Sequence, residues 1–270
     1  GSDCSGGAGI QADIKTISAL GGYAASAITA VTVQNTVGVR AVHVVPAEIV
    51  CGQIEAVMED LHPDAVKIGM ISEEETVRAI ADCLRKFRPE HVVYDPVMVS
   101  TSGRKLMNDA AIEIIKKELF PLTTLLTPNL DEVEVLTGKK IVVLEDMQQV
   151  ARELSAIYRT AVLIKGGHWP GDEMQDILCA DGNLFIYKEK KIVSKNLHGT
   201  GCTLSSSIAT YLALGYTMNE AVGKAKNYLS KAIDAGKEIV AGKGNGPLCH
   251  FWNPEKAQII DDKADRIEGK

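Results

Sequence analysis

Hydrophobic positions recur along the chain with two different spacings, and these spacings predict strands that alternate with helices. Short runs of Val, Ile, Leu and Ala are typical of buried strands, whereas apolar residues three or four apart are typical of helices. The predicted strands are 24–33, 65–68, 91–95, 125–127 and 161–164. The predicted helices are 10–20, 46–60, 72–87, 109–119, 146–158 and 220–239, with one more beginning near 200. This alternation predicts an α/β fold with a doubly wound, mostly parallel sheet and helices on both faces.

One pair of segments departs from this alternation. Residues 176–181 and 184–188 flank Gly182-Asn183. Because Asp181-Gly182 is a strong turn pair, we expect them to form a small β-hairpin added to the sheet. We find no repeat or linker, so residues 1–270 are predicted to form a single domain. The charged tail from about Asn253 is expected to be loosely ordered.

Three predicted helices begin with the pattern of a capping box, in which an N-cap side chain and an acidic residue three positions later bond each other's backbone N–H. The pairs are Ser72 with Glu75, Asn129 with Glu132, and Thr217 with Glu220. The middle pair has a second interpretation, because an amide and a carboxylate one helical turn apart can hold a hydrated Mg²⁺ near phosphates. Taken alone, the spacing favours the cap.

Composition narrows the class of partner. Apolar residues make up 46% of the chain and aromatic residues only 5%, which suits a core of parallel strands covered by helices. The net charge of −6 includes no basic stripe, so nucleic acid and anionic membrane surfaces are not expected partners. No apolar run approaches the roughly 20 residues that span a bilayer.

The six cysteines are scattered without the spacing of metal ligands. Scatter over a chain this long favours reduced thiols, and therefore a cytoplasmic location, over a disulfide framework. Zinc is not expected for the same reason.

The strongest chemical signal is the stretch 196–205, in which Gly199 and Gly201 precede a helical pattern. A helix start has unpartnered N–H groups and a positive dipole end, and glycines let the backbone curl around an anion. Residues 199–202 therefore predict an anion pocket with one reactive side chain, Cys202. A glycine-rich cap with a buried, inert cysteine explains these residues equally well.

Weaker signals lie in a second glycine-rich loop and at strand ends. The loop 1–9 precedes a helical pattern, and a preceding strand is absent, so Gly1-Ser2 is either a remnant of a tag or the sequence lacks a first strand. Gln34, Asp95 and Lys165 each follow a predicted strand, where open α/β sheets bind ligands. Each also has an ordinary interpretation as a turn, capping or surface residue.

Taken together, these motifs resemble the ribokinase-like superfamily, and within it the hydroxymethylpyrimidine/phosphomethylpyrimidine kinases of thiamine biosynthesis. The resemblance covers the chain from Gly1 to about Phe251. The motifs that carry it are residues 1–13, 30–36, Lys67–Met70, Asp95–Met98, Thr127–Glu132, Lys165–His168, His198–Thr203 and Gly242–Pro247. It implies a ribokinase-like kinase domain whose first strand is missing before Gly1.

The resemblance also implies a site. It assigns the pyrimidine alcohol to Gly1, Asp3, Ala8, Gln34, Met70, Val97 and Cys202. It assigns ATP to Asn129, Lys165, Gly167 and Thr200, with the transferred phosphate over the catalytic group Lys165, Gly199, Thr200, Gly201 and Cys202. It assigns Mg²⁺, held through water, to Asp95, Asn129 and Glu132.

By this resemblance the enzyme phosphorylates 4-amino-5-hydroxymethyl-2-methylpyrimidine with ATP, and then phosphorylates the monophosphate to the pyrophosphate. Cys202 is expected to accept the proton of the alcohol, because a thiol at a helix N-terminus has a lowered pKa. A pyridoxal kinase of the same branch is the alternative activity, and a non-catalytic vitamin-binding protein on the same scaffold is the alternative class. The family suggests a homodimer.

Overall fold

The computed structural model of the protein describes residues 1–98, 107, 109–167 and 171–258. The strands of its main sheet are β3 (Ala65–Ile68), β4 (His91–Tyr94), β5 (Leu125–Leu126), β6 (Ala161–Ile164), β7 (Glu173–Ala180) and β8 (Asn183–Lys190). In the described residues they lie in the order β3-β4-β5-β6-β7-β8, with β3 to β6 parallel and β7 and β8 antiparallel. The predicted mostly parallel sheet with a hairpin addition is confirmed.

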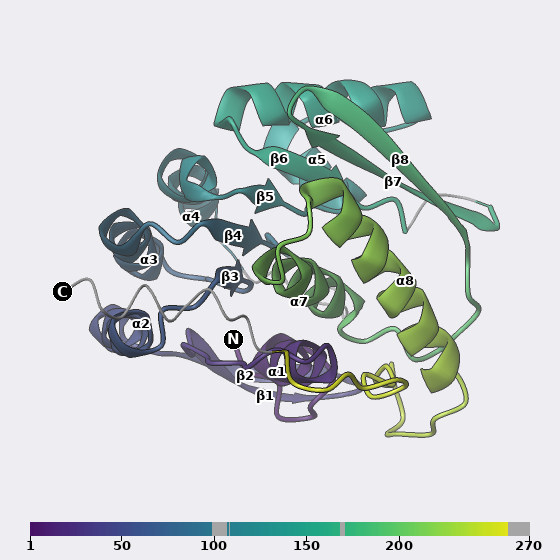
Figure 1. Ribbon diagram of the computed structural model, residues 1–270, viewed down its shortest axis with the longest axis horizontal. Coiled ribbons are helices and arrows are strands. Elements are labelled where there is room, and N and C mark those ends of the chain that lie inside the picture. The colour runs from purple at the N-terminus through teal and green to yellow at the C-terminus, as the bar shows by residue number, and fades with distance from the viewer. Residues whose placement is uncertain (99–106, 108, 168–170, 259–270) are drawn as a thin grey trace.

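Helices cover both faces of this sheet (Figure 1). They are α1 (Gly9–Ala19), α2 (Ala47–Asp60), α3 (Glu74–Phe87), α4 (Asp109–Ile114), the π-helix η1 (Ile115–Leu119), the 3-10 helix η2 (Phe120–Leu122), α5 (Leu130–Thr137), α6 (Leu144–Tyr158), α7 (Thr200–Ala213) and α8 (Met218–Gly236). The core residues of α7 and α8 belong to one hydrophobic cluster, and those of α2 to α6 belong to another. None of these helices is both long enough and apolar enough to cross a bilayer.

Side chains of the strand β4 pack into the hydrophobic clusters on both faces of the sheet. Val92 and Tyr94 point into the core under α2 to α6, and Val93 points into the core under α7 and α8. All three are at most 1% exposed. Successive side chains of a strand point to opposite faces, so a strand covered on both faces must be apolar throughout. This is why the runs predicted as buried strands read as continuous Val, Ile and Leu.

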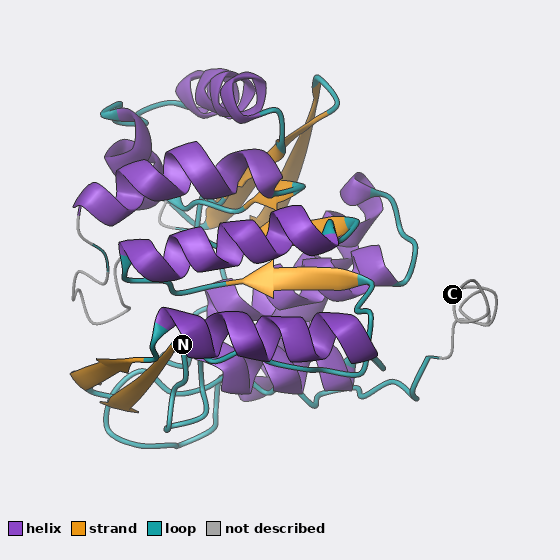
Figure 2. Ribbon diagram, turned by 90° about the vertical axis from the view of Figure 1, so that its left-hand side faces the viewer, coloured by secondary structure: helices purple, strands orange, loops and turns teal. Residues whose placement is uncertain are grey.

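A second, two-stranded sheet lies apart from the main one, formed by β1 (Ala30–Asn35) and β2 (Gly38–Val44) (Figure 2). The prediction of a buried strand over 24–33 is therefore right only for 30–33, and burial on both faces is wrong. No strand forms before Ala30, and Val31 and Val33 are 47% and 53% exposed. A run of small and β-branched residues indicates extended backbone, but only the tertiary structure decides whether both faces are covered.

One of the three predicted capping boxes forms completely. The Asn129 side chain accepts the Glu132 N–H at 2.9 Å, and the Glu132 carboxylate accepts the Asn129 N–H at 2.7 Å. At the start of α8 half of the box forms, because the Glu220 carboxylate accepts the Thr217 N–H at 3.0 Å while the Thr217 side chain makes no cap bond to the backbone. The box of Ser72 with Glu75 is wrong, because α3 begins only at Glu74 and has no side-chain cap. Two glutamates in the first turn of α3 favour the helix start through its dipole instead.

The described part of the tail makes two backbone hydrogen bonds with the end of α1. The backbone N–H of Glu255 donates to Ala19 at 2.8 Å, and that of Gln258 donates to Gly21 at 2.9 Å. These bonds fix residues 255–258 against the end of α1. Residues 259–270, the rest of the predicted tail, lie outside the described residues, as does His168 of the Lys165–His168 motif.

Candidate active site

A cavity of about 1410 Å³ opens where β3, β4, β5 and β6 end and α7 begins. Carboxyl ends of parallel strands meet at one edge of a sheet, so residues that are far apart in sequence converge there. The cavity also continues as an apolar groove between α1, α2 and β3. The predicted site residues that line it are Gly1, Asp3, Ala8, Gln34, Met70, Asp95, Val97, Asn129, Glu132, Lys165, Gly167, Gly199, Thr200, Gly201 and Cys202.

The predicted anion pocket is built by two glycine-rich loops in backbone contact. Gly199 has φ +85°, a left-handed conformation that favours glycine, and α7 begins at the next residue. A Cβ atom at Gly199 would lie 1.9 Å from the carbonyl oxygen of Gly7, so no side chain fits between the loops. The N–H group of Thr200 makes a long bond of 3.4 Å to the Leu197 carbonyl oxygen. The next N–H groups, those of Gly201 and Cys202, precede the first intrahelical bonds of α7 and are available to an anion.

Beside this pocket, a buried lysine contacts two carboxylates. Lys165 Nζ lies 2.6 Å from Asp95 Oδ1 and 3.9 Å from Glu132 Oε2. The Thr127 hydroxyl also donates to Asp95 Oδ1, at 3.0 Å. A Cβ atom at Gly201 would lie 3.1 Å from Asp95 Oδ2, so the first turn of α7 packs directly on this cluster.

Burial and mutual charge change the titration of the cluster. Burial raises the pKa of Glu132 to about 7, and the Asp95 charge adds to the rise while Lys165 opposes it. Burial works against the charge of Lys165, but Asp95 and Glu132 outweigh it and raise the pKa of that lysine. When Glu132 is ionised, two carboxylates face one ammonium. That excess of negative charge suits a hydrated divalent cation, which takes oxygen ligands and keeps several waters.

Direct coordination of a metal by the protein is not supported. Within the described ranges, no three His, Cys, Asp or Glu side chains are grouped closely enough to hold a metal ion. Glu132 also uses one oxygen to cap α5. The oxygens of Asp95, Asn129 and Glu132 line the cavity, where the family resemblance places a Mg²⁺ ion held through water.

Cys202 lies in the first turn of α7 and lines the cavity, but its titration differs from the prediction. Burial raises the pKa of the thiol, Asp13 and Asp95 add to the rise, and Lys67 and the Gly9 N–H oppose it only partly. The expected lowering by the helix N-terminus is therefore wrong. The desolvation of a buried thiolate outweighs the partial charges at the helix start.

Lys67 is a charged residue of the cavity that the sequence analysis did not assign to the site. Its Nζ lies 2.8 Å from Asp13 Oδ1, and the lysine side chain is only 6% exposed. The Ser206 hydroxyl donates to the same oxygen at 2.8 Å. A lysine inside the apolar run Ala65–Ile68 was the available signal, because a charge buried in a strand needs a partner. Its positive charge lowers the pKa of the Cys202 thiol and partly opposes the effect of burial.

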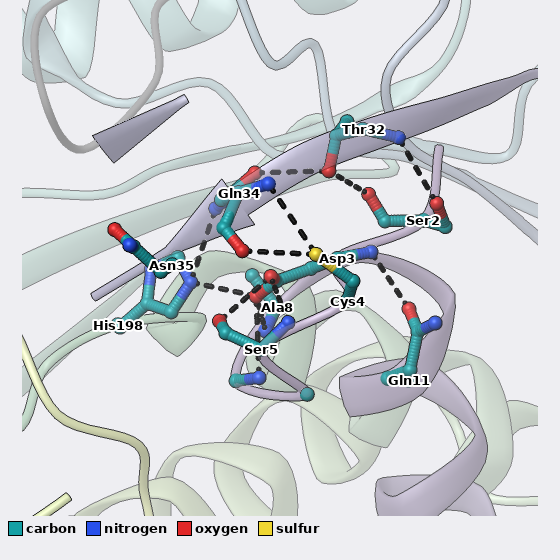
Figure 3. Close-up of polar contacts among 12 residues, drawn as sticks. Ser2, Asp3, Cys4, Ser5, Ala8, Gln11, Thr32, Gln34, Asn35 and His198 are labelled. Carbon is teal, nitrogen blue, oxygen red and sulfur yellow. Dashed lines mark hydrogen bonds and ion pairs between the residues drawn. The ribbon is translucent and has the colours of Figure 1, made fainter. Parts of the chain in front are cut away.

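The Asp3 carboxylate organises the first glycine-rich loop rather than remaining open to a ligand (Figure 3). Its Oδ1 accepts the N–H and hydroxyl of Ser5 at 2.9 and 2.7 Å. Its Oδ2 accepts the N–H groups of Gly7 and Ala8 at 3.2 and 2.9 Å. Burial opposes its charge, but hydrogen bonds from His198 and Ser5 outweigh burial and hold the pKa of Asp3 well below its usual range.

His198 ties the two loops together. Its Nε2 lies 2.7 Å from Asp3 Oδ2, and the histidine is 6% exposed. Its ring also packs on Gly7, where a Cβ atom would lie 2.5 Å from His198 Cδ2. The sequence analysis placed His198 within a motif but gave it no role, because its partner is 195 positions away in the chain.

The mostly parallel sheet, the glycine-rich start of α7 and the buried Lys–carboxylate cluster at the strand ends agree with the ribokinase-like kinase class that the sequence motifs resemble. The sequence model of the family described as phosphomethylpyrimidine kinase matches residues 3–249. The chain belongs to this family, and it is a phosphotransferase.

Relatives and solved structures agree with this assignment. The chain is 51% identical to a hydroxymethylpyrimidine/phosphomethylpyrimidine kinase of Rhizobium meliloti, over 93% of this chain and 94% of that protein. It is 46% identical to a thiamine biosynthesis bifunctional protein of Geobacter sulfurreducens, of which it spans 52%. The chain thus corresponds to nearly all of the first relative and to about half of the second.

Among solved structures, the chain resembles a phosphomethylpyrimidine kinase of Clostridium difficile with a TM-score of 0.77 and 47% identity, over 86% of this chain and 96% of that one. It also resembles a pyridoxal kinase of Staphylococcus aureus in complex with ADP, with a TM-score of 0.85 and 32% identity, over 95% and 93%. Both substrate classes of the sequence analysis are therefore represented among similar folds. The more similar sequences are pyrimidine kinases.

Proposed function

We propose that this protein uses ATP to phosphorylate 4-amino-5-hydroxymethyl-2-methylpyrimidine, and then phosphorylates the monophosphate to the pyrophosphate. The observation that carries the proposal is that the N-terminus of α7, Lys165, Cys202 and Gln34 all line one cavity. Phosphoryl transfer needs positioning and charge stabilisation more than covalent chemistry by the protein. This cavity supplies both.

On the ATP side of the cavity, several groups are proposed to stabilise the negative charge of the phosphates. The N–H groups after Gly199 and the Lys165 ammonium are proposed to hold the transferred phosphoryl group, whose equatorial oxygens gain charge in the transition state. Gly167 and Thr200 are proposed to line the nucleotide path. Mg²⁺, held through water by Asp95, Asn129 and Glu132, would supply further neutralisation of the phosphate oxygens.

On the acceptor side, Gly1, Ala8, Met70 and Val97 are proposed to enclose the pyrimidine ring, and Cys202 is proposed to contact its hydroxymethyl group. The raised pKa means that Cys202 is a thiol in the resting enzyme. Any role as proton acceptor is therefore restricted to the small thiolate fraction. The second transfer uses an ionised phosphate as acceptor and has little need of a base.

The experiment that tests the proposal measures ADP release with three acceptors side by side. These are the hydroxymethylpyrimidine, its monophosphate and pyridoxal, with Lys165→Met as the control that removes the phosphate-binding charge. We expect turnover of both pyrimidines at kcat/KM values well above that of pyridoxal. Turnover of pyridoxal alone would replace this proposal with the alternative, which the similarity to Staphylococcus aureus pyridoxal kinase keeps in view.

We also propose that the chain forms a homodimer through the outer face of β1 and β2. Val31, Val33 and Val37 are 47%, 53% and 67% exposed, and contiguous exposed apolar residues mark interaction sites. Sedimentation equilibrium of the wild type should give a dimer, and the double variant Val31→Lys, Val33→Lys should dissociate it. A monomeric wild type would refute the proposal.

The cysteines support the predicted reducing compartment, and we propose a cytoplasmic location on that ground. All six are unpaired. The Sγ atoms of Cys51 and Cys83 lie 3.3 Å apart with no bond between them. Disulfides persist in oxidising compartments, where such a pair would be at risk of oxidation.

A further inference from the structure

The Gln34 amide lies between two side chains that decide which way it faces. In the structure its Nε2 is 3.2 Å from His198 Nε2, and its Oε1 is 3.4 Å from the Thr32 hydroxyl (Figure 3). Half a turn about the terminal bond exchanges the amide nitrogen and oxygen without changing the shape of the side chain. The hydrogen atoms of the two neighbours therefore select the orientation.

The hydrogen on His198 is set by Asp3. The same Nε2 that faces Gln34 lies 2.7 Å from Asp3 Oδ2, and an ionised carboxylate can only accept hydrogen bonds. The Asp3 pKa lies well below its usual range, so this carboxylate is ionised at neutral pH. His198 Nε2 must therefore carry a hydrogen, whether the ring is neutral or charged. An amide NH₂ turned toward it would set donor against donor.

The hydrogen on Thr32 is set by the backbone of the first loop. The Thr32 hydroxyl donates to the Ser2 carbonyl oxygen at 2.9 Å, a shorter contact than the 3.4 Å to Gln34 Oε1. A hydroxyl has one hydrogen and two lone pairs, so the side facing Gln34 is an acceptor. Thr32 is 5% exposed, which leaves few competing partners. An amide oxygen turned toward it would set acceptor against acceptor.

We infer that Gln34 is held with its Oε1 toward His198 and its Nε2 toward Thr32, and that these two neighbours are thereby positioning residues for substrate selection. In this orientation the Gln34 amide donates to the Thr32 hydroxyl, and its Oε1 shares the single His198 Nε2–H with Asp3 Oδ2. One amide hydrogen and one carbonyl lone pair remain for a ligand in the cavity, and their order along the amide is fixed. The reverse orientation would face the Gln34 NH₂ toward the His198 N–H and its Oε1 toward a Thr32 lone pair, so neither contact would be favourable.

A fixed order of donor and acceptor distinguishes an amine from a carbonyl on a heterocycle. This step rests on the proposed function. A 4-aminopyrimidine presents an amine donor beside a ring nitrogen acceptor, which a glutamine amide can pair with in a bidentate manner. The 4-oxo counterpart presents a carbonyl beside a ring N–H, the opposite order. A freely turning amide would accept both, whereas a fixed amide accepts only one.

The test compares kcat/KM for the 4-amino substrate with that for its 4-oxo counterpart. We expect the wild type to prefer the amine strongly, and Thr32→Val, which keeps the shape and removes the acceptor, to lower that preference by roughly tenfold. His198→Leu should lower it similarly, and the double variant should lower it further. Thr32→Ser keeps the hydroxyl and should restore the preference. A general loss of structure would lower both activities without changing their ratio.

Two outcomes separate this inference from the proposed function. If neither pyrimidine is phosphorylated, the proposed function fails. If the amine is phosphorylated and Thr32→Val keeps the wild-type ratio, the inference fails and the function stands. Neutron diffraction of the free wild-type enzyme gives a second test that needs no variant to fold. Deuterium on the Gln34 amide atom that faces Thr32 is expected, and deuterium on the atom that faces His198 would overturn the inference.

Discussion

At the scale of single residues, burial decides the chemistry of the site more than sequence neighbours do. Glu132 lies in the first turn of α5 and Cys202 in the first turn of α7. At both places the positive end of the helix dipole favours the negatively charged form of the side chain. In both, burial dominates and raises the pKa. The dipole at a helix start stabilises a negative charge by up to about 2 kcal/mol. Complete burial can shift a pKa by about 3–5 units, which corresponds to roughly 4–7 kcal/mol and is the larger effect.

Glu132→Gln tests the cost of this buried carboxyl group. The folded pKa is raised from 4.5 to about 7, so the folded protein holds the proton more tightly than the unfolded chain. The wild type should therefore lose stability as pH rises from about 4.5 to 7, by up to about 3 kcal/mol relative to Glu132→Gln. Lys165 and Asp95, the charged groups that face Glu132, are unchanged in the variant.

Urea denaturation at pH 5 and pH 8 measures the difference. The two proteins should be similar in stability at pH 5, and the variant should be the more stable at pH 8. A constant difference between the two pH values would mean that Glu132 titrates normally in the folded state.

Cys202 gives a second prediction at this scale. If the thiolate accepts the proton of the alcohol, kcat/KM for the first transfer should rise about tenfold per pH unit from neutrality toward the raised pKa. Cys202→Ala should lower the first transfer by on the order of 100-fold, remove this pH dependence, and change the second transfer little. Equal losses in the two transfers, measured as ADP release with each acceptor, would assign Cys202 to positioning instead.

At the scale of elements, the site depends on how closely two loops approach each other. The loop before α1 and the loop before α7 touch through Gly7 and Gly199, and Asp3 and His198 join them again behind this contact. Neither loop shows this partner in its own sequence. What the sequence does show is the glycine, the residue that permits both a positive φ and close approach.

Gly199→Ala tests that contact, with Gly138→Ala as the matched control. Both glycines have positive φ, +85° and +69°, so alanine is strained at each by about 1 kcal/mol. At Gly138 a Cβ meets nothing within 4 Å, whereas at Gly199 it would overlap the Gly7 carbonyl. We expect Gly199→Ala to lower kcat/KM by at least about 100-fold, since small misplacements near the reacting atoms are costly.

The control should lose stability and keep its activity. Thermal unfolding and ADP release measured on both variants separate strain from displacement of the loop. Equal activities in the two variants would show that the loops can move apart without harm.

At the scale of the whole molecule, a buried ion pair connects the helix α8 to the end of β6, where Lys165 lies. Lys226 of α8 lies 2.6 Å from Asp176 of β7, and Asp176 accepts the Gly166 N–H at 2.7 Å. Gly166 directly follows Lys165. The long helix α8 is thereby connected to the residue that we propose holds the phosphate.

Lys226→Met should leave Asp176 as an unpaired buried carboxylate and destabilise the fold by about 3 kcal/mol. It should also raise the KM for ATP, because the Gly166 backbone loses a fixed partner. Lys237→Met, which breaks an exposed pair with Asp234 on the same stretch, is the control. Urea denaturation should show little change for the control, and a similarly small effect of Lys226→Met would contradict the role of the buried pair.

The sequence by itself determined the local order of this protein. Hydrophobic spacing predicted the strands β3 to β6 and the helices α3, α4 and α6, and the pair Asn129 with Glu132 marked the start of α5. Glycine-rich motifs and the family resemblance named residues that line one cavity. These features succeed because they depend on neighbours a few positions apart. Asn129 with Glu132 forms its capping box for the same reason.

Only the tertiary structure decided what depends on distant partners. It placed β1 in a separate sheet with Val31 and Val33 exposed, raised the pKa of Cys202, and joined Asp3 to His198 across 195 positions. Burial and long-range hydrogen bonds arise when separate segments pack together. No local pattern records which surface will cover a strand or which side chain will meet a buried carboxylate.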